Sequence, residues 1–204
     1  MTEPATIAYP VVETFHSVQG EGAWTGVNAF FIRLGGCDVG CWFCDTKESW
    51  NSGAHPQHKI TDLIDEVCRP NPGIVVITGG EPLMHDLGPL TAQLRTMGLR
   101  VHLETSGAYP ISGTFDWVTL SPKKMKVPHE SVYLYVDELK VVVSHRSDLE
   151  WAEKQAARVP STALKYLQPE WSNREQSTAL AIEYVLTHPQ WRISLQTHKF
   201  LKVR

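Results

Sequence analysis

Apolar segments with the character of strands alternate with amphipathic helical segments along most of this 204-residue chain. The expected strands are 27–34, 74–78, 100–104, 117–120, 139–143, 163–168 and 191–196. The expected helices are 59–69, 87–97, 148–158 and 178–188. Because a strand and helix in succession return to the sheet through a right-handed crossover, this alternation predicts an α/β fold with mostly parallel strands.

The number of strands bears on how such a sheet is closed. Seven expected strands are few for a closed eight-stranded barrel, which usually takes about 250 residues. An incomplete (β/α) barrel fits better, and a doubly wound open sheet is the alternative that the pattern leaves open. Since no linker rich in Pro, Gly or Ser divides the chain, we expect residues 1–204 to form a single domain.

Residues with useful chemistry follow the expected strands directly. Cys37 comes after the first strand, the segment 79–82 (Gly-Gly-Glu-Pro) after the second, and Glu104 stands at the end of the third. Ser121 and Gln168 occupy the same place at two later strands. Parallel α/β folds bind ligands at the carboxyl ends of their strands, so one rim is expected to collect all of these groups.

Composition limits the class of partner. Nineteen Lys and Arg against 22 Asp and Glu give a net charge of −3, which argues against nucleic acid because phosphate contacts need clustered positive charge. No apolar run approaches the roughly 18 residues of a membrane span, and the start of the chain lacks the basic and apolar regions of an export signal. We therefore expect a cytoplasmic protein that uses neither membrane nor nucleic acid.

Three of the four cysteines, Cys37, Cys41 and Cys44, lie within eight residues in the pattern C-x3-C-x2-C. Thiolates on one short loop select zinc or an iron–sulfur centre. A closed structural zinc site needs a fourth ligand, and Cys68 is a poor candidate because it lies on the apolar face of the helix 59–69. A 4Fe-4S cluster on three cysteines leaves one iron open to another ligand. We favour that cluster over structural zinc or three packed free thiols.

Together, this triad and the strand-following segment Thr78-Gly79-Gly80-Glu81-Pro82 resemble the radical S-adenosylmethionine (SAM) superfamily. The resemblance implies that the open iron chelates the amino and carboxylate groups of SAM. It also implies a one-electron donor such as flavodoxin or ferredoxin, cleavage of SAM to a 5′-deoxyadenosyl radical, and hydrogen abstraction from a bound substrate.

A finer resemblance rests on F-H-S-V-Q-G-E-G (15–22), F-I-R-L-G-G-C (31–37), C-D-T (44–46) and the tail L-Q-T-H-K-F (195–200). These segments are similar to the 7-carboxy-7-deazaguanine synthase family, and the match runs from about residue 13 to the end of the chain. It implies a carbon–nitrogen lyase that converts 6-carboxy-5,6,7,8-tetrahydropterin to 7-carboxy-7-deazaguanine with loss of ammonia, for 7-deazapurines such as queuosine. It further implies regeneration of SAM, a requirement for Mg²⁺, a homodimer, and a modified, incomplete barrel.

The resemblance assigns cofactor roles residue by residue. Cys37, Cys41 and Cys44 would hold the cluster, and Thr46 would be the protein ligand of Mg²⁺, although a threonine hydroxyl in a loop often only bonds to backbone. The residues expected around SAM are Phe43, Cys44, Asp45, Gly80, Glu104, Ser106, Ser121, Pro122, Lys123 and Gln168.

The resemblance also implies a substrate side. Its members are Val18, Gln19, Gly20, Glu21, Arg33, Thr78, His198 and Arg204, the last through its terminal carboxylate. Amide edges suit the donor and acceptor pattern of a pterin ring. Arg33 lies inside an apolar strand, where it either grips the substrate carboxylate as a fork or is paired structurally. No residue is assigned to direct catalysis.

Two other functions remain as alternatives. A glycyl-radical activating enzyme shares the cysteines and Gly-Gly-Glu-Pro but needs a large protein partner, and the Q-G-E-G and C-D-T segments argue against it. A zinc-stabilised binding module would be no enzyme at all. Some family members have a longer first cysteine spacing, so contacts made by their insertion cannot be transferred to this chain.

Overall fold

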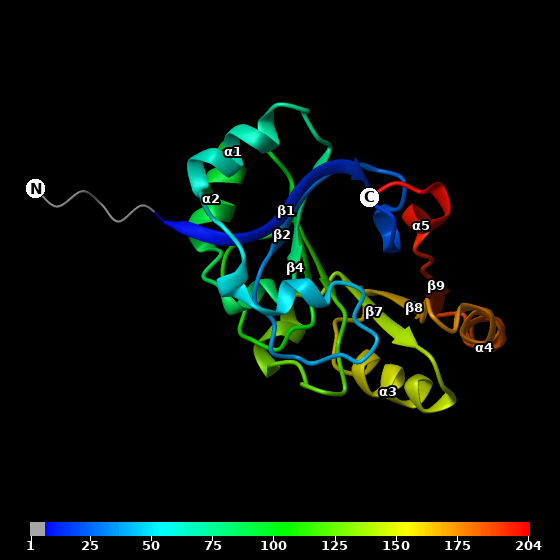
Figure 1. Cartoon of the computed structure of the whole chain (residues 1–204). Helices are drawn as coiled ribbons and strands as arrows, with labels where there is room; N and C mark the ends of the chain where they lie inside the picture. The colour runs from blue at the N-terminus through cyan, green and yellow to red at the C-terminus, as the bar shows by residue number, and fades with distance from the viewer. Residues whose placement is uncertain (1–6) are drawn as a thin grey trace, which may run out of the picture.

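The computed structural model describes residues 7–204; the first six, part of the segment considered above for an export signal, lie outside the described residues. Its strands are β1 (Ala8–Val18), β2 (Asn28–Leu34), β3 (Gln57–Lys59), β4 (Ile74–Gly79), β5 (Val101–Thr105), β6 (Trp117–Leu120), β7 (Glu138–Val143), β8 (Leu164–Pro169) and β9 (Trp191–Ile193). Its α-helices are α1 (Ile60–Cys68), α2 (Gly88–Thr96), α3 (Arg146–Ala156), α4 (Arg174–Thr187) and α5 (Thr197–Leu201). Figure 1 shows their arrangement.

All of these strands belong to one nine-stranded sheet in the order β3-β1-β2-β4-β5-β6-β7-β8-β9. From β2 to β9 every neighbouring pair is parallel, whereas β1 is antiparallel to β2 and to β3. The order never reverses after β2, so the chain winds in one direction, as in a barrel. This confirms the incomplete barrel and removes the doubly wound sheet, which requires a reversal of strand order.

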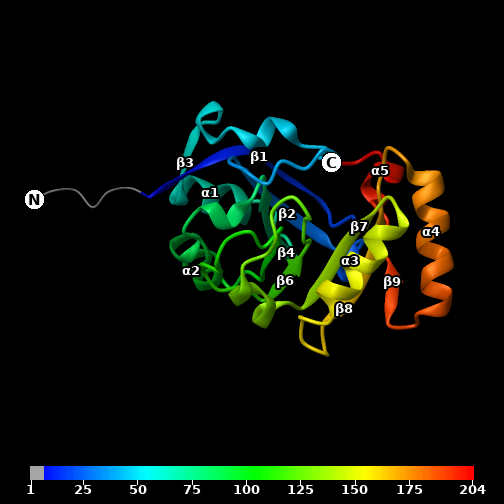
Figure 2. The same cartoon turned by 90° about the horizontal axis from the view of Figure 1, so that it is seen from below.

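The two faces of the sheet differ because side chains alternate along a strand. On β2, Phe30, Ile32 and Leu34 face the main core, while Phe31 and Arg33 face the other side. The main core lies between the sheet and the helices α1 to α4, which Figures 1 and 2 show along the outside. The opposite face is apolar at its floor, where Phe31 packs with Val76, and becomes polar toward the strand ends.

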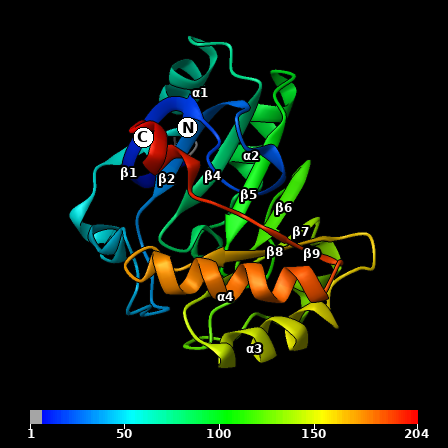
Figure 3. The same cartoon turned by 90° about the vertical axis from the view of Figure 1, so that its right-hand side faces the viewer.

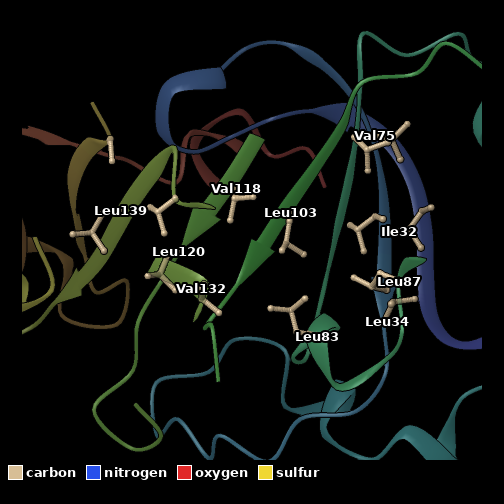
Figure 4. Close-up of a cluster of buried hydrophobic side chains, with 14 of the residues drawn as sticks. Ile32, Leu34, Val75, Leu83, Leu87, Leu103, Val118, Leu120, Val132 and Leu139 are labelled. Atoms are coloured by element: carbon tan, nitrogen blue, oxygen red, sulfur yellow. The ribbon is translucent and has the colours of Figure 1, made fainter. Parts of the chain in front are cut away.

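The main core is a continuous apolar layer. Leu103 on β5, Leu120 on β6 and Leu139 on β7 are fully buried in it, and Figure 4 shows their side chains with those of β2 and β4. This layer gives the sheet a rigid backing, so the residues at its strand ends are held by a well-packed scaffold.

The sequence pattern located β2, β4 to β9 and α1 to α4 with small errors at their ends. It missed β1, because Pro10 and the mostly polar segment 13–17 hide the alternation in this strand, which bulges between Val11 and Glu13. It also missed the short strand β3, whose last residue was expected to begin the helix 59–69, and the helix α5.

Within residues 7–204, no helix is long and apolar enough to cross a membrane.

The buried layer makes a direct prediction about stability. Leu103→Ala should lower the free energy of unfolding by about 2–5 kcal/mol, because Leu103 is 0% exposed and truncation leaves a cavity. Leu186→Ala is the matched control; Leu186 is 80% exposed, so its effect should stay within about 0.5 kcal/mol. Urea unfolding measures both, and equal effects would contradict the assignment of the core.

Candidate active site

A large cavity of about 580 Å³ opens at the carboxyl ends of the parallel strands. The structure brings nearly all of the expected site residues to its wall. These are Val18, Gln19, Gly20, Glu21, Arg33, Cys37, Cys41, Phe43, Cys44, Asp45, Thr46, Thr78, Gly80, Glu104, Ser106, Ser121, Lys123, Gln168, His198 and Arg204. Pro122 differs: it is buried and does not line the cavity.

The cysteine loop leaves β2 and folds back on the segment that follows it. The amide of Gly36 donates to the carbonyl of Ser49 (2.7 Å), and the amide of Cys37 donates to the carbonyl of Trp50 (3.0 Å). A turn then brings the amide of Cys44 to the carbonyl of Cys41 (3.2 Å). These bonds fix both ends of the loop, so that the three cysteines meet the same cavity.

The cysteine loop presents three sulfur donors to the cavity, and soft thiolates suit zinc or an iron–sulfur centre. Across residues 7–204, no three thiol, imidazole or carboxylate side chains are gathered closely enough to hold a single metal ion. A zinc site needs all its sulfurs about 2.3 Å from one centre, whereas a cluster binds its cysteines through separate irons. Burial raises the pKa of Cys37 and of Cys41, and the neighbouring thiols add to this rise. Cationic iron would supply the charge that ionises them.

Gly79 and Gly80 bring the end of β4 against the end of β2. The amide of Gly80 donates to the carbonyl of Leu34 (3.0 Å), and the amide of Glu81 donates to the carbonyl of Gly36 (2.8 Å). A Cβ on Gly80 would lie 2.4 Å from the Gly36 carbonyl oxygen and 2.7 Å from Cβ of Cys37. A side chain is therefore excluded here, because the backbone of the cysteine loop occupies its place.

Glu81 ties the same strand end to β5. Its carboxylate, in a residue that is 1% exposed, accepts from Oγ1 of Thr105 (2.5 Å) and from the amide of Ser106 (2.8 Å). It also accepts from the hydroxyl of Ser106 and the amide of Leu83 (3.0 Å). The Glu of Gly-Gly-Glu-Pro thus acts as a clamp between strands, which compensates the cost of burying its carboxylate.

Buried charges occupy the middle of the cavity face. Nζ of Lys140, on β7, donates to Glu21 and to Oε2 of Glu104 (3.1 Å). Gln19 completes the contact, since its Nε2 donates to Oε1 of Glu104 (2.8 Å) and its Oε1 accepts from the amide of Glu21 (3.1 Å). Burial raises the pKa of Glu104, but the Lys140 ammonium outweighs this and holds the pKa below its usual value.

The C-terminal tail crosses from β9 to β1, as Figure 3 shows, and its residues Gln196, His198, Lys199 and Arg204 line the cavity. The carbonyl of Gly20 accepts from the amide (2.9 Å) and the hydroxyl (2.9 Å) of Thr197. A Cβ on Gly20 would lie 2.2 Å from Nδ1 of His198, so the glycine permits this close contact. Nζ of Lys199 reaches Oδ2 of Asp45 (2.9 Å), which joins the tail to the cysteine loop.

Arg33 is paired with a residue that the sequence pattern did not indicate. Its Nε donates to Oε1 of Glu13 (2.9 Å), directly across the β1–β2 pair. Arg204 also contacts Glu13, and the backbone oxygen of Arg204 accepts from the hydroxyl of Ser17 (2.7 Å). Because Nε is used by Glu13, the outer nitrogens of the Arg33 guanidinium remain for a ligand in the cavity.

Lys123 stands apart because no carboxylate within residues 7–204 forms an ion pair with it. Its Nζ donates to the carbonyl (2.7 Å) and hydroxyl (2.6 Å) of Ser121. Burial lowers its pKa, and the thiol group of Cys41 opposes that shift. Such a buried cation beside the cysteine loop provides a place for an anionic group.

Several residues of the cavity wall were not predicted from the sequence. Lys140 is the most important, and its signal was the same as that of Arg33, a basic residue inside an otherwise apolar strand. Gln196 and Lys199 also line the cavity, and both lie in the tail segment 195–200 that carries the family resemblance, which could have indicated them. Trp171 lines the cavity too but had no distinctive local pattern. Nζ of Lys199 lies 4.9 Å from the ring centre of Trp171.

Comparisons with known proteins agree with this arrangement. A model of the radical SAM superfamily matches residues 31–121. The 7-carboxy-7-deazaguanine synthase of Synechocystis is 55% identical over 100% of this chain and 98% of its own length. The chain belongs to the 7-carboxy-7-deazaguanine synthase family.

Other members of the family support the same conclusion. The enzyme of Escherichia coli is 36% identical over 96% of this chain and 99% of its own. The crystal structure of QueE from Escherichia coli superposes with a TM-score of 0.82, at 34% identity, over 92% of this chain and 93% of that one. Membership makes the chain an enzyme of the radical SAM type, which implies a 4Fe-4S cluster and SAM. It leaves no support for a glycyl-radical activating enzyme or a zinc-stabilised binding module.

The close approach of β4 to the cysteine loop gives a prediction. Gly80→Ala should destabilise the fold by about 1–3 kcal/mol, because its Cβ meets backbone atoms that cannot move independently of the loop. Gly53→Ala is the control, since the nearest atom to its Cβ is 3.4 Å away. Thermal unfolding of the two variants would show equal midpoints if the crowding at Gly80 were unimportant.

Proposed function

We propose that this chain converts 6-carboxy-5,6,7,8-tetrahydropterin to 7-carboxy-7-deazaguanine with release of ammonia, as a step in the synthesis of 7-deazapurines such as queuosine. The observation that carries the proposal is 55% identity over the full chain to a synthase of that name. Its support is that the Q-G-E-G segment, C-D-T and the tail, far apart in sequence, line the same cavity.

Cys37, Cys41 and Cys44 would hold a 4Fe-4S cluster in the wall of this cavity. When bound, the cluster and SAM supply a one-electron cleavage that yields a hydrogen-abstracting 5′-deoxyadenosyl radical. The chain contributes the position of the cluster. The half-buried Phe43 stands between the second and third cysteines, and its ring centre lies 5.1 Å from that of Trp42.

The SAM side of the cavity would use groups that come from several strand ends. Gly80 and the unpaired ammonium of Lys123 suit the methionine part of SAM, whose carboxylate needs a cation. Glu104 is held ionised by Lys140 and can accept from ribose hydroxyls. Phe43, Asp45, Ser106, Ser121 and Gln168 complete this proposed set. The buried Pro122 is left out of direct contact.

The substrate side would lie toward β1 and the tail. Val18, Gln19, Gly20, Glu21 and Thr78 offer backbone, amide, hydroxyl and carboxylate groups to the pterin ring. The outer nitrogens of Arg33 suit the substrate carboxylate. Burial lowers the pKa of His198, although Glu21 opposes the shift, so its imidazole is neutral at pH 7 and can donate from one nitrogen and accept at the other. Arg204 would contribute from the tail, since it lines the same cavity.

Thr46 is the proposed protein ligand of Mg²⁺. Its Oγ1 lies 3.7 Å from Sγ of Cys44, so a metal on this hydroxyl would sit beside the cluster loop. Mg²⁺ prefers oxygen ligands and keeps several of them for water and substrate, so one threonine and the substrate carboxylate suffice to place it.

The reaction needs a reductant, for which we propose a small one-electron carrier such as flavodoxin or ferredoxin. A cytoplasmic location fits, because free thiols persist in a reducing compartment. We also propose a homodimer, on the strength of the family resemblance alone.

The proposed reaction is tested by an oxygen-free assay. Protein carrying about four irons, with SAM, Mg²⁺, dithionite and the carboxypterin, should form a 7-deazapurine that mass spectrometry detects. Cys41→Ala should lose iron and product yet remain folded, because Cys41 lies on a loop outside the core strands. Absence of a new deazapurine from iron-loaded native protein would reject the proposal.

The magnesium ligand has a separate test. Thr46→Ala should raise the Mg²⁺ concentration needed for half-maximal rate by roughly tenfold, since one oxygen ligand is lost. Thr46→Ser keeps the hydroxyl and should respond like the native protein. If Thr46→Ala showed an unchanged metal response and a weaker affinity for SAM, Thr46 would serve SAM and not the metal.

A further inference from the structure

Lys140 is a buried ammonium with two carboxylate partners on different walls of the cavity. Its side chain is 4% exposed and projects from β7 on the same face as Glu138 and Val142. Glu21 reaches it from the segment that follows β1, and Glu104 from the end of β5 (3.1 Å). Glu138 is the third carboxylate whose charge acts on it, and burial raises the pKa of that group.

The two partners of Lys140 also belong to one closed ring of hydrogen bonds. Gln19 donates to Glu104 (2.8 Å) and accepts from the amide of Glu21 (3.1 Å), while Lys140 donates to both carboxylates. Glu21 carries a further contact, from Nε2 of Gln196 in the tail (3.0 Å). A change in the hydrogen bonding of either carboxylate therefore affects the other carboxylate through the Gln19 side chain and the Lys140 ammonium.

The two ends of this bridge face different ligands if the proposed function is correct. Glu21 lies among the groups proposed for the pterin, next to Gly20 and the tail. Glu104 lies beside Thr105 and Ser106, among the groups proposed for SAM. Stability of the fold does not explain a lysine at this position, because a buried ion pair rarely stabilises a protein more than well-packed apolar side chains in the same place.

We propose that Lys140 is a positioning residue that couples the two ligand sites, so that a bound pterin strengthens the binding of SAM and SAM strengthens the binding of the pterin. This rests on the proposed function, which assigns the two sites. One ammonium shared by two carboxylates cannot satisfy both fully. When a ligand N–H donates to Glu21, that carboxylate depends less on Lys140, and the Lys140 ammonium can bind Glu104 more fully. Glu104 is then held in the orientation in which it accepts hydrogen bonds from ribose hydroxyls. The first ligand pays the cost of ordering the bridge, and the second binds to an ordered one.

Calorimetry of oxygen-free, cluster-loaded protein tests this without turnover. The Kd of SAM is measured with and without pterin-6-carboxylate, the fully oxidised form of the proposed substrate, in which the saturated carbons are absent. In native protein the pterin should lower the Kd of SAM by roughly tenfold, and SAM should lower the Kd of the pterin by the same factor. In Lys140→Met that factor should fall to about one, and Lys140→Arg should restore part of it, because a cation is again shared.

The design separates coupling from structure and from the assignment of substrate. If Lys140 had only a structural role, Lys140→Met would bind both ligands more weakly while the coupling factor stayed at its native value. That result would overturn the proposal, and so would a coupling factor of one in the native protein. Glu21→Gln cuts the bridge at its other end and should also abolish coupling if Lys140→Met does not fold. Lys124→Met, which removes an exposed ion pair to Asp148, is the control and should keep the native factor. Failure of pterin-6-carboxylate to bind would count against the proposed substrate class instead.

Discussion

The site depends on the close approach of two backbone segments, Gly79 and Gly80 at the end of β4 and residues 34–36 at the end of β2. Two amide donors span this contact, and the space for a side chain at Gly80 is filled by the cysteine loop. The contact fixes where Cys37 begins the loop. From the same segment, Glu81 reaches Thr105 and Ser106, so the ends of three neighbouring strands are held as one unit. The cysteines thus take their position from the sheet and not only from their own loop.

A second constraint is the polarity of the cavity face. The sheet is backed by a continuous apolar layer, and the floor of the opposite face is also apolar. Above that floor lie Lys140, Glu104, Glu21 and Arg33, charges that would be costly if they were alone. Each is paired: Lys140 with two carboxylates, and Arg33 with Glu13. The pairs keep charged groups available to ligands at positions where the side chains are largely buried, so that their electrostatic interactions are stronger than at the surface.

The C-terminal tail forms part of the cavity wall that the incomplete barrel does not provide. The sheet has open edges at β3 and β9, and the segment after β9 crosses to β1. Thr197 and His198 pack on Gly20, and Lys199 reaches Asp45 of the cysteine loop. Residues from the beginning, the cysteine loop and the end of the chain therefore form one wall. This explains why similarity to the family includes the tail and is not limited to the radical SAM core at residues 31–121.

The amino-acid sequence by itself determined the parallel α/β architecture, the cysteine triad and the strand ends that carry polar groups. These follow from local periodicity and from spacing within a few residues, which a linear pattern records directly. The strand β1 was not predicted, since Pro10 and polar residues mask its alternation of apolar and polar side chains. Only the tertiary structure decided that Lys140 joins Glu21 to Glu104, that Glu13 pairs with Arg33, and that Pro122 is turned away from the cavity. Such partners are separated by 20 to 119 positions, and their pairing depends on strand order and register, which arise from the packing of the whole chain.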